Sequence, residues 1–206
     1  MRQVIIPPLA PTIDRAELRL RGLRREDASS WFAYLADPIV IEHTSFPVQS
    51  LVSVEALIEQ SQRGYSQRTS CKWALARTSD DALIGTCGFN GWALEHASTE
   101  LAYDLAREHW GKGLMSQGVA VALNWGFNTV GFNRIHALVM ISNLRSVRLL
   151  ERLGFRQEGT LRSYRVARGV PRDFWMYSLL QAEWTAASNG RMTVTGADGG
   201  HGLVDA

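Results

Sequence analysis

Cysteine is scarce in this sequence, and no long apolar run occurs in it. The 206 residues include two cysteines, Cys71 and Cys87, which do not form a C-x-x-C pair. A chain of this length does not need a disulfide to fold, so we interpret both residues as free thiols. No stretch approaches the ~18 consecutive apolar residues that a membrane-spanning helix requires. These absences exclude a disulfide-stapled module and a protein held in a membrane by such a helix.

The N-terminus also lacks the features of a secretion signal. The stretch from Val4 to Pro11 is apolar, but three prolines interrupt it and no small-residue cleavage site follows. We therefore expect a cytoplasmic protein.

Neither sign of charge dominates the chain. Twenty-two Lys and Arg residues against 20 Asp and Glu residues give a net charge of +2. This excess is too small to attract nucleic acid or an anionic membrane, so we expect neither as a partner. The five histidines show no metal-ligand spacing with one another or with the cysteines, and we predict no metal site.

The apolar content is that of one compact domain. Apolar residues make up 46% of the chain and charged residues 20%, and a domain of this size buries roughly 70% of the surface that its unfolded chain exposes. Near residue 187 the hydrophobic periodicity ends, and glycine and polar residues prevail. We assign residues 1–187 to a single domain and residues 188–206 to a glycine-rich tail.

Hydrophobic periodicity predicts alternating strands and helices. We expect strands at Leu18–Arg21, Lys72–Arg77, Leu83–Phe89, Thr99–Leu105 and Arg134–Ile141, and helices at Glu26–Ala36, Ser53–Arg63 and Met115–Phe127. Ser53 is the expected N-cap of the second helix. The apolar run at Arg134–Ile141 is typical of an interior parallel strand, reached from the strand at Thr99–Leu105 by a right-handed crossover. The fold class is therefore α+β, with some α/β character.

The turn before the third helix is the first sign of chemistry. Gly111 and Gly113 flank Lys112, and glycines let the backbone approach a ligand closely, next to a helix start that favours anions. A P-loop would need glycine where Ala106 stands, and a dinucleotide fingerprint or a hydrolase nucleophile elbow would need further glycines that are absent. Two interpretations stay open, a phosphate-binding turn and a tight turn ahead of a core helix.

A second pattern follows the apolar strand, from Asn143 to Phe155. It predicts a short helix with Asn143 as N-cap, leucines turned to the core, arginines turned outward and Gly154 as the C-terminal stop. Asn143 and Ser146 could serve only as caps.

Together these segments resemble the GCN5-related N-acetyltransferase (GNAT) family, and within it the RimJ/RimL-like branch. The resemblance spans about Leu18 to Trp184. It rests on the opening strand and helix, on Trp110-Gly111-Lys112-Gly113, on Asn143-x-x-Ser146 with Leu153-Gly154-Phe155, and on a closing hairpin. It implies the GNAT fold, a central mixed and mostly antiparallel sheet with one splayed parallel pair and helices on both faces.

The resemblance also implies acetyl-CoA as co-substrate and residues that hold it. Backbone groups of Leu105 and Ala106 are expected to pair with the pantetheine amides, and the Asn143 side chain to bond the same arm. The pyrophosphate is expected on the backbone of Gly111, Lys112, Gly113, Leu114, Met115 and Ser116. Glu108 stands where the family usually has glutamine or arginine, so its carboxylate must turn outward.

The catalytic assignments implied are Glu100 as general base, Tyr103 as its orienting group and Ser146 as the hydroxyl for the departing thiolate. Near pH 7 a peptide α-amine loses its proton readily, so even a weak base is sufficient. The reaction therefore says little about which residue acts as the base. Glu100 could instead be a solvated strand residue. The expected activity is acetyl transfer to a primary amine, either a protein N-terminus or a small molecule such as a polyamine, aminoglycoside or amino acid.

Other possibilities stay open at this point. One is a coenzyme-binding regulatory module without turnover, and another is a homodimer. Four arginines on or beside the closing hairpin form either a solvated face or a site for acidic substrates or for the coenzyme's 3′-phosphate. They are Arg162, Arg165, Arg168 and Arg172.

Overall fold

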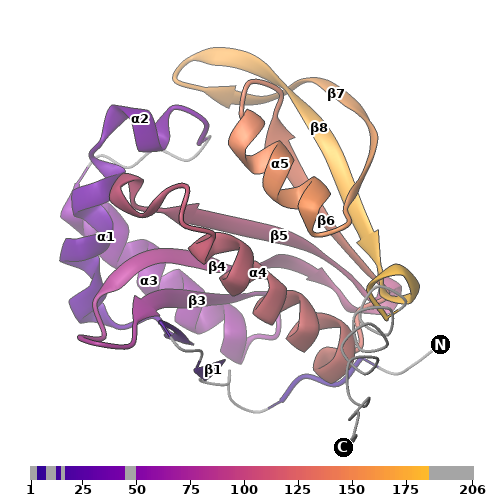
Figure 1. The fold of residues 1–206 in the computed structure, drawn as a ribbon, viewed down its shortest axis with the longest axis horizontal. Helices are drawn as coiled ribbons and strands as arrows, with labels where there is room; N and C mark the ends of the chain where they lie inside the picture. Colours follow the sequence, from indigo (N-terminus) through magenta and orange to yellow (C-terminus); the bar gives the residue numbers. More distant parts are fainter. Residues whose placement is uncertain (1–3, 8–12, 15–16, 45–49, 186–206) are drawn as a thin grey trace, which may run out of the picture.

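The computed structural model describes residues 4–7, 13–14, 17–44 and 50–185. In this part of the chain one eight-stranded sheet has the order β1-β2-β3-β4-β5-β6-β8-β7 (Figure 1). The strands are β1 (Ile13–Asp14), β2 (Leu18–Gly22), β3 (Cys71–Arg77), β4 (Leu83–Ala93), β5 (Ser98–Leu105), β6 (Arg134–Met140), β7 (Arg156–Ala167) and β8 (Val170–Leu180). The predicted tail at 188–206 and residues 8–11 of the apolar N-terminal stretch lie outside the described residues.

Five labelled α-helices accompany the strands in the described ranges, and residues 181–185, the last ones described, are also helical. The labelled helices are α1 (Ala28–Leu35), α2 (Pro38–Ile41), α3 (Leu51–Ser66), α4 (Leu114–Asn124) and α5 (Leu144–Arg152). Short 3-10 turns occupy Arg25–Asp27, Leu94–His96 and Arg107–His109, and a π-helical turn at Trp125–Val130 continues α4. None of the described helices is long and apolar enough to cross a bilayer.

The sheet is mixed, as predicted. β3 and β4 form the expected antiparallel hairpin, and β7 and β8 form the closing one. β5 and β6 are the parallel pair, joined through α4. All other neighbouring strands run antiparallel.

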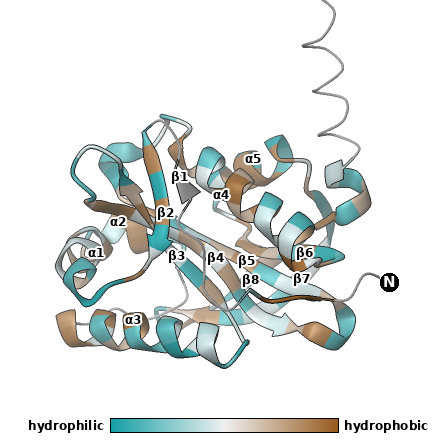
Figure 2. Cartoon of the chain, turned by 90° about the horizontal axis from the view of Figure 1, so that it is seen from below, coloured by the Kyte–Doolittle hydropathy of each residue, from teal (hydrophilic) through white to brown (hydrophobic). Residues whose placement is uncertain are grey.

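Helices cover both faces of the sheet. Figure 2 shows α3 on one side and α4 and α5 on the other. The larger core cluster lies under α4 and α5, where the rings of Trp73 and Trp125 meet with centroids 5.0 Å apart. A second cluster joins α1 and α3 to the opposite face through Trp31, Ala74 and other apolar side chains, and a third, much smaller one consists of Met140, Ala167 and Phe174. The first two clusters are the product of alternating side chains along the central strands.

Both cysteines are buried and unpaired, so the prediction of free thiols is confirmed. Burial raises the pKa of Cys87 to about 12 and raises the pKa of Cys71 well above its usual value. Because the thiolate is the reactive form, neither residue suits nucleophilic chemistry.

Helix boundaries differ from the prediction in one instructive place. The N-cap of α3 is Ser50, and Ser53 is the third residue of the helix. The Ser50 hydroxyl accepts the Ser53 N–H, and the Ser53 hydroxyl accepts the Ser50 N–H. Either serine satisfies the cap pattern in sequence, and only this reciprocal capping box distinguishes them.

A buried ion pair anchors the first helical turn to β2. Arg21 and Asp27 meet through two hydrogen bonds of 2.8 Å, with side chains only 4% and 6% exposed. Asp27 is one of two carboxylates that pair with the buried Arg21 guanidinium, and the other is Asp81 at 2.9 Å. Because Asp27→Asn would remove the more buried of these two partners, we expect it to lower the free energy of unfolding by about 2 kcal/mol in urea titrations. As a control, Asp80→Asn breaks an exposed pair with Arg77 and should leave the unfolding midpoint near wild type. Equal midpoints for the two variants would contradict this role of Asp27.

Candidate active site

The parallel pair separates after three residues. β5 pairs with β6 only from Ser98 to Glu100, opposite Arg134 to His136. Beyond this point β6 continues with β8 as far as Met140, and β5 continues with β4 as far as Leu105. The edge of β5 that faces β6 therefore has no strand partner from Leu101 to Leu105.

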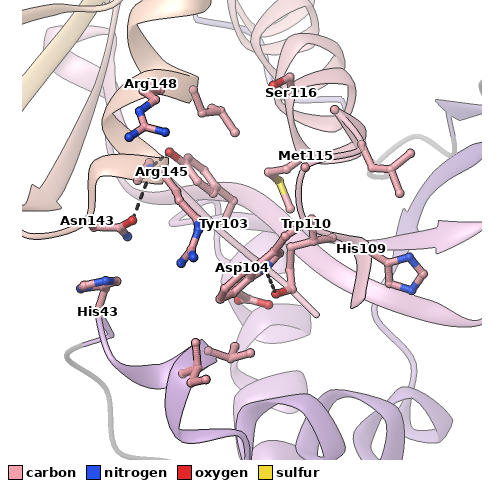
Figure 3. A pocket seen from close by; sticks show the side chains of 18 of the residues that line it. His43, Tyr103, Asp104, His109, Trp110, Met115, Ser116, Asn143, Arg145 and Arg148 are labelled. Atoms are coloured by element: carbon pink, nitrogen blue, oxygen red, sulfur yellow. Dashed lines mark hydrogen bonds between the residues drawn. The ribbon is translucent and has the colours of Figure 1, made fainter. Parts of the chain in front are cut away.

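A cavity of about 420 Å³ opens beside this free edge, and Figure 3 shows the side chains around it. Its walls come from α2, the end of β5, the turn before α4, the start of α4, and α5. Nine of the residues singled out from the sequence line it: Tyr103, Leu105, Gly111, Gly113, Leu114, Met115, Ser116, Asn143 and Ser146. Glu100, Ala106 and Lys112 are not among the lining residues.

The turn before α4 is built by its two glycines and by Trp110. Gly111 and Gly113 both have φ of +75°, a left-handed conformation that L side chains rarely adopt, and a Cβ at either would meet no atom within 4 Å. The Trp110 indole donates to the Leu105 carbonyl over 2.9 Å, which ties the turn to the end of β5. No side chain caps α4, so its first N–H groups face the cavity without an intrahelical acceptor.

Glu108 turns outward, as the resemblance requires. Its side chain is 79% exposed and its carboxylate lies 3.2 Å from Nε2 of His109. Burial lowers the pKa of His109, which is one of the lining residues. The Glu108 carboxylate is thus directed away from the helix start.

Ser146 and Tyr103 meet at the bottom of the separation between β5 and β6. Their oxygens lie 2.5 Å apart, and burial raises the pKa of Tyr103. The Asn143 side chain accepts the Ser146 N–H over 3.1 Å, so Asn143 is the N-cap of α5 as predicted. The hydroxyl of Ser146 has no part in that cap.

Glu100 lies on the opposite face of β5 from Tyr103, because strand residues three apart point to opposite sides. Tyr103 contacts Ser146, so the prediction that it orients Glu100 is wrong. The Glu100 carboxylate instead accepts from Arg165 over 3.2 and 3.4 Å. The Arg165 guanidinium in turn lies over the rings of Tyr164 and Phe174.

Asp104 is a lining residue that the sequence analysis did not single out. Thr86 donates to its carboxylate over 2.7 Å, and the Tyr34 hydroxyl donates to the other oxygen. Alternation along β5 places Asp104 on the same face as Glu100, and its carboxylate on a mostly apolar strand was the signal that could have identified it.

Arginines of α5 form the other unexpected part of the wall. Arg145, Arg148 and Arg152 are exposed as predicted, but they also line the cavity. Arg145 reaches across to the turn before α4, where its guanidinium lies 4.4 Å from the Trp110 ring centroid. This wall gives the cavity positive charge suited to phosphate groups.

Comparison with known proteins identifies the family. The sequence profile described as "Acetyltransferase (GNAT) domain" matches residues 17–156. This chain belongs to the GNAT acetyltransferase family.

Relatives within the family agree with the RimJ/RimL-like resemblance. The GNAT chain is 34% identical to the uncharacterized N-acetyltransferase p20 of Bacillus licheniformis over 174 residues, 84% of this chain and 98% of that protein. It is 36% identical to the ribosomal protein uS5-alanine N-acetyltransferase of Escherichia coli over 122 residues, 59% of this chain and 63% of that protein. The GNAT chain is therefore an acyltransferase that uses acetyl-CoA, and the predictions of family and reaction type are confirmed.

A solved structure shows the same fold. The Microcin C7 self immunity acetyltransferase MccE, in complex with acetyl-CoA and AMP, superposes with a TM-score of 0.73 at 20% identity, over 81% of this chain and 93% of that one.

Proposed function

We propose that this GNAT enzyme moves the acetyl group of acetyl-CoA to the α-amine of a polypeptide N-terminus by direct attack in a ternary complex. The free edge of β5 from Leu101 to Leu105, beside the cavity, carries the proposal. An unpaired strand edge is a template for the amides of an extended ligand, and the pantetheine arm has such amides. MccE, a chain with the same fold, was solved in complex with acetyl-CoA, which supports binding of this coenzyme by the fold.

The turn before α4 fits the coenzyme's pyrophosphate. Its open glycine positions let phosphate oxygens approach the backbone, and the uncapped N–H groups of Leu114, Met115 and Ser116 supply donors at the positive end of a helix. Lys112 and the arginines of α5 add charge. Leu105 and Ala106 are the residues we assign to the pantetheine amides.

The bound coenzyme supplies an activated thioester. A peptide α-amine has a pKa near ~8, so a weak base suffices to free its lone pair near pH 7. We assign this base role to Glu100, whose carboxylate Arg165 holds in place. We assign to Ser146 a hydrogen bond from its hydroxyl to the departing thiolate, with Tyr103 holding that hydroxyl in position. The amine loses its proton to Glu100, and the released thiolate takes up a proton from solvent.

A polypeptide acceptor is favoured by one relative. The Escherichia coli relative is named for an alanine of ribosomal protein uS5, and its match to this chain is 36% identical. Protein α-amines are also the acceptors that need the least from a base.

The test is release of coenzyme A from acetyl-CoA over a panel of amines. We expect peptides with a free N-terminal alanine or serine to give turnover, and the same peptides with a blocked N-terminus to give none. Turnover with spermidine or an aminoglycoside, but with none of the peptides, would contradict the polypeptide acceptor and point to a small-molecule amine. Binding of acetyl-CoA in calorimetry without release on any amine would favour a regulatory module.

Asn143 provides a more limited test, because it both caps α5 and lines the cavity. We expect Asn143→Ala to lower the free energy of unfolding by about 1 kcal/mol through the lost cap. We also expect acetyl-CoA to bind several-fold more weakly in calorimetry, since we assign the Asn143 amide to the pantetheine arm. Asn143→Ser keeps a capping oxygen but not an amide, so it should restore stability more than affinity. Equal recovery of both would remove the ligand role.

A further inference from the structure

Two arginines face each other across the closing hairpin. Arg165 of β7 and Arg172 of β8 are register partners, so their side chains lie on the same face of the hairpin, with Cα atoms about 5 Å apart. Like charges directly opposite each other destabilise a strand pair. A nearby anion would offset this repulsion between the two guanidinium groups.

Only one of these charges is balanced within the described residues. Arg165 is paired with Glu100 at 3.2 Å. Arg172 is exposed and has no ion-pair partner in the described part of the chain. The hairpin therefore presents one excess positive charge, that of Arg172, opposite the arginine that contacts Glu100.

The hairpin reaches toward α2, as Figure 1 shows. Arg168, close to the hairpin turn, donates to the carbonyl of Ile41 over 2.5 Å and also to the carbonyl of Glu42. These carbonyls lie at the end of α2, next to His43, which lines the cavity. The arginine pair therefore stands at the Glu100 side of the site, while Arg148 and Arg152 line the coenzyme cavity itself.

We propose that Arg172, together with Arg165, forms a subsite for a carboxylate side chain at the second to fourth residue of the acceptor polypeptide. This inference rests on the proposed function, in which the α-amine approaches Glu100. Since an extended chain advances about 3.3 Å per residue, the next few residues span the width from Glu100 across two strands. The ring of Tyr164, which is 47% exposed, offers an apolar contact on the same hairpin.

The test compares two acceptor peptides of equal shape, Ala-Asp-Glu-Asp-Gly-Gly amide and its uncharged counterpart Ala-Asn-Gln-Asn-Gly-Gly amide. For the wild-type enzyme we expect a KM about 3–10-fold lower for the acidic peptide, an advantage that shrinks in 0.5 M salt. In Arg172→Gln the KM of the acidic peptide should rise to that of its counterpart, and Arg172→Lys should keep most of the advantage. The change should appear in KM and not in kcat.

Arg63→Gln is the matched control, because Arg63 is an exposed arginine on α3, 61% exposed, and its loss changes the net charge equally. It should keep the peptide preference. Equal KM values for the two peptides with the wild-type enzyme, or an equal loss in Arg63→Gln, would overturn the subsite. A weaker affinity of Arg172→Gln for acetyl-CoA in calorimetry, with the peptide preference intact, would also overturn it and assign Arg172 to the coenzyme phosphate.

Failure of the subsite can be distinguished from failure of the proposed acetyl transfer. If no amine releases coenzyme A, binding of the fluorescein-labelled acidic peptide in the presence of coenzyme A is measured by anisotropy. An Arg172-dependent preference over the uncharged peptide would retain the subsite, and no preference would overturn it.

Discussion

Gly113→Val is expected to weaken acetyl-CoA binding by at least about 100-fold while the protein still folds. A Cβ at Gly113 meets no protein atom within 4 Å, so the valine side chain projects into the space that we assign to the pyrophosphate. There it would keep phosphate oxygens from the N–H groups at the start of α4, and each lost charged hydrogen bond is worth about 1.5–3 kcal/mol. Isothermal calorimetry with acetyl-CoA measures the loss directly.

Backbone strain must be separated from this steric effect, because valine is disfavoured at the left-handed φ of +75°. Gly169, in the turn between β7 and β8, has φ of +74° and the same open surroundings, and it is not a cavity-lining residue. We expect Gly169→Val to lose similar stability and to keep acetyl-CoA affinity. If Gly113→Val fails to fold, Gly113→Ala gives a smaller version of the same comparison. Wild-type affinity in the folded Gly113 variants would contradict the assignment of the turn to the coenzyme.

Ser146→Ala is expected to lower kcat by about 10–1000-fold, because the hydroxyl that we assign to the departing thiolate is removed. Affinity for acetyl-CoA should stay near wild type, since that interaction develops only as the thioester breaks. Stability should change little, because the N-cap of α5 is the Asn143 side chain and the Ser146 backbone N–H remains. Steady-state and single-turnover rates, with urea unfolding of the same preparations, measure all three quantities.

Tyr103→Phe is the matched comparison, because it removes the partner of the Ser146 hydroxyl and leaves that hydroxyl in place. If Tyr103 positions Ser146, this variant should reduce kcat by less than Ser146→Ala does, and the double variant should be no slower than Ser146→Ala alone. A kcat for Ser146→Ala within twofold of wild type would remove Ser146 from the mechanism.

Local patterns were enough to predict most of the longer helices and strands and the glycine turn before α4, but not the short elements β1 and α2. Gly111 and Gly113 adopt the positive φ that only glycine takes freely, and Asn143 is a cap by its own chemistry. Such features depend on residues a few positions apart, so the sequence contains their cause.

Contacts between distant segments were not predictable in the same way. Glu100 and Arg165 are 65 positions apart, and Tyr103 and Ser146 are 43 apart. Neither pairing follows from period or propensity. The partner of Tyr103 depends on which face of β5 packs against α5. The contact of Arg145 with the Trp110 ring depends on the position of that ring in the folded protein. The partners of long charged side chains are determined by the tertiary packing around them.

The short parallel pairing has a consequence for how the molecule unfolds. β5 and β6 share three residue pairs, whereas β6 and β8 share seven. Within the sheet, the strands from β6 onward are joined to the rest by these three pairs, while side chains of the larger core cluster pack across both parts. We expect this seam to open locally below the global unfolding energy. A ligand lodged across the seam would hold the two parts together. By linkage it would add about 2.7 kcal/mol at a hundred times its Kd, so amide exchange in β6, β7 and β8 would report occupancy without any turnover.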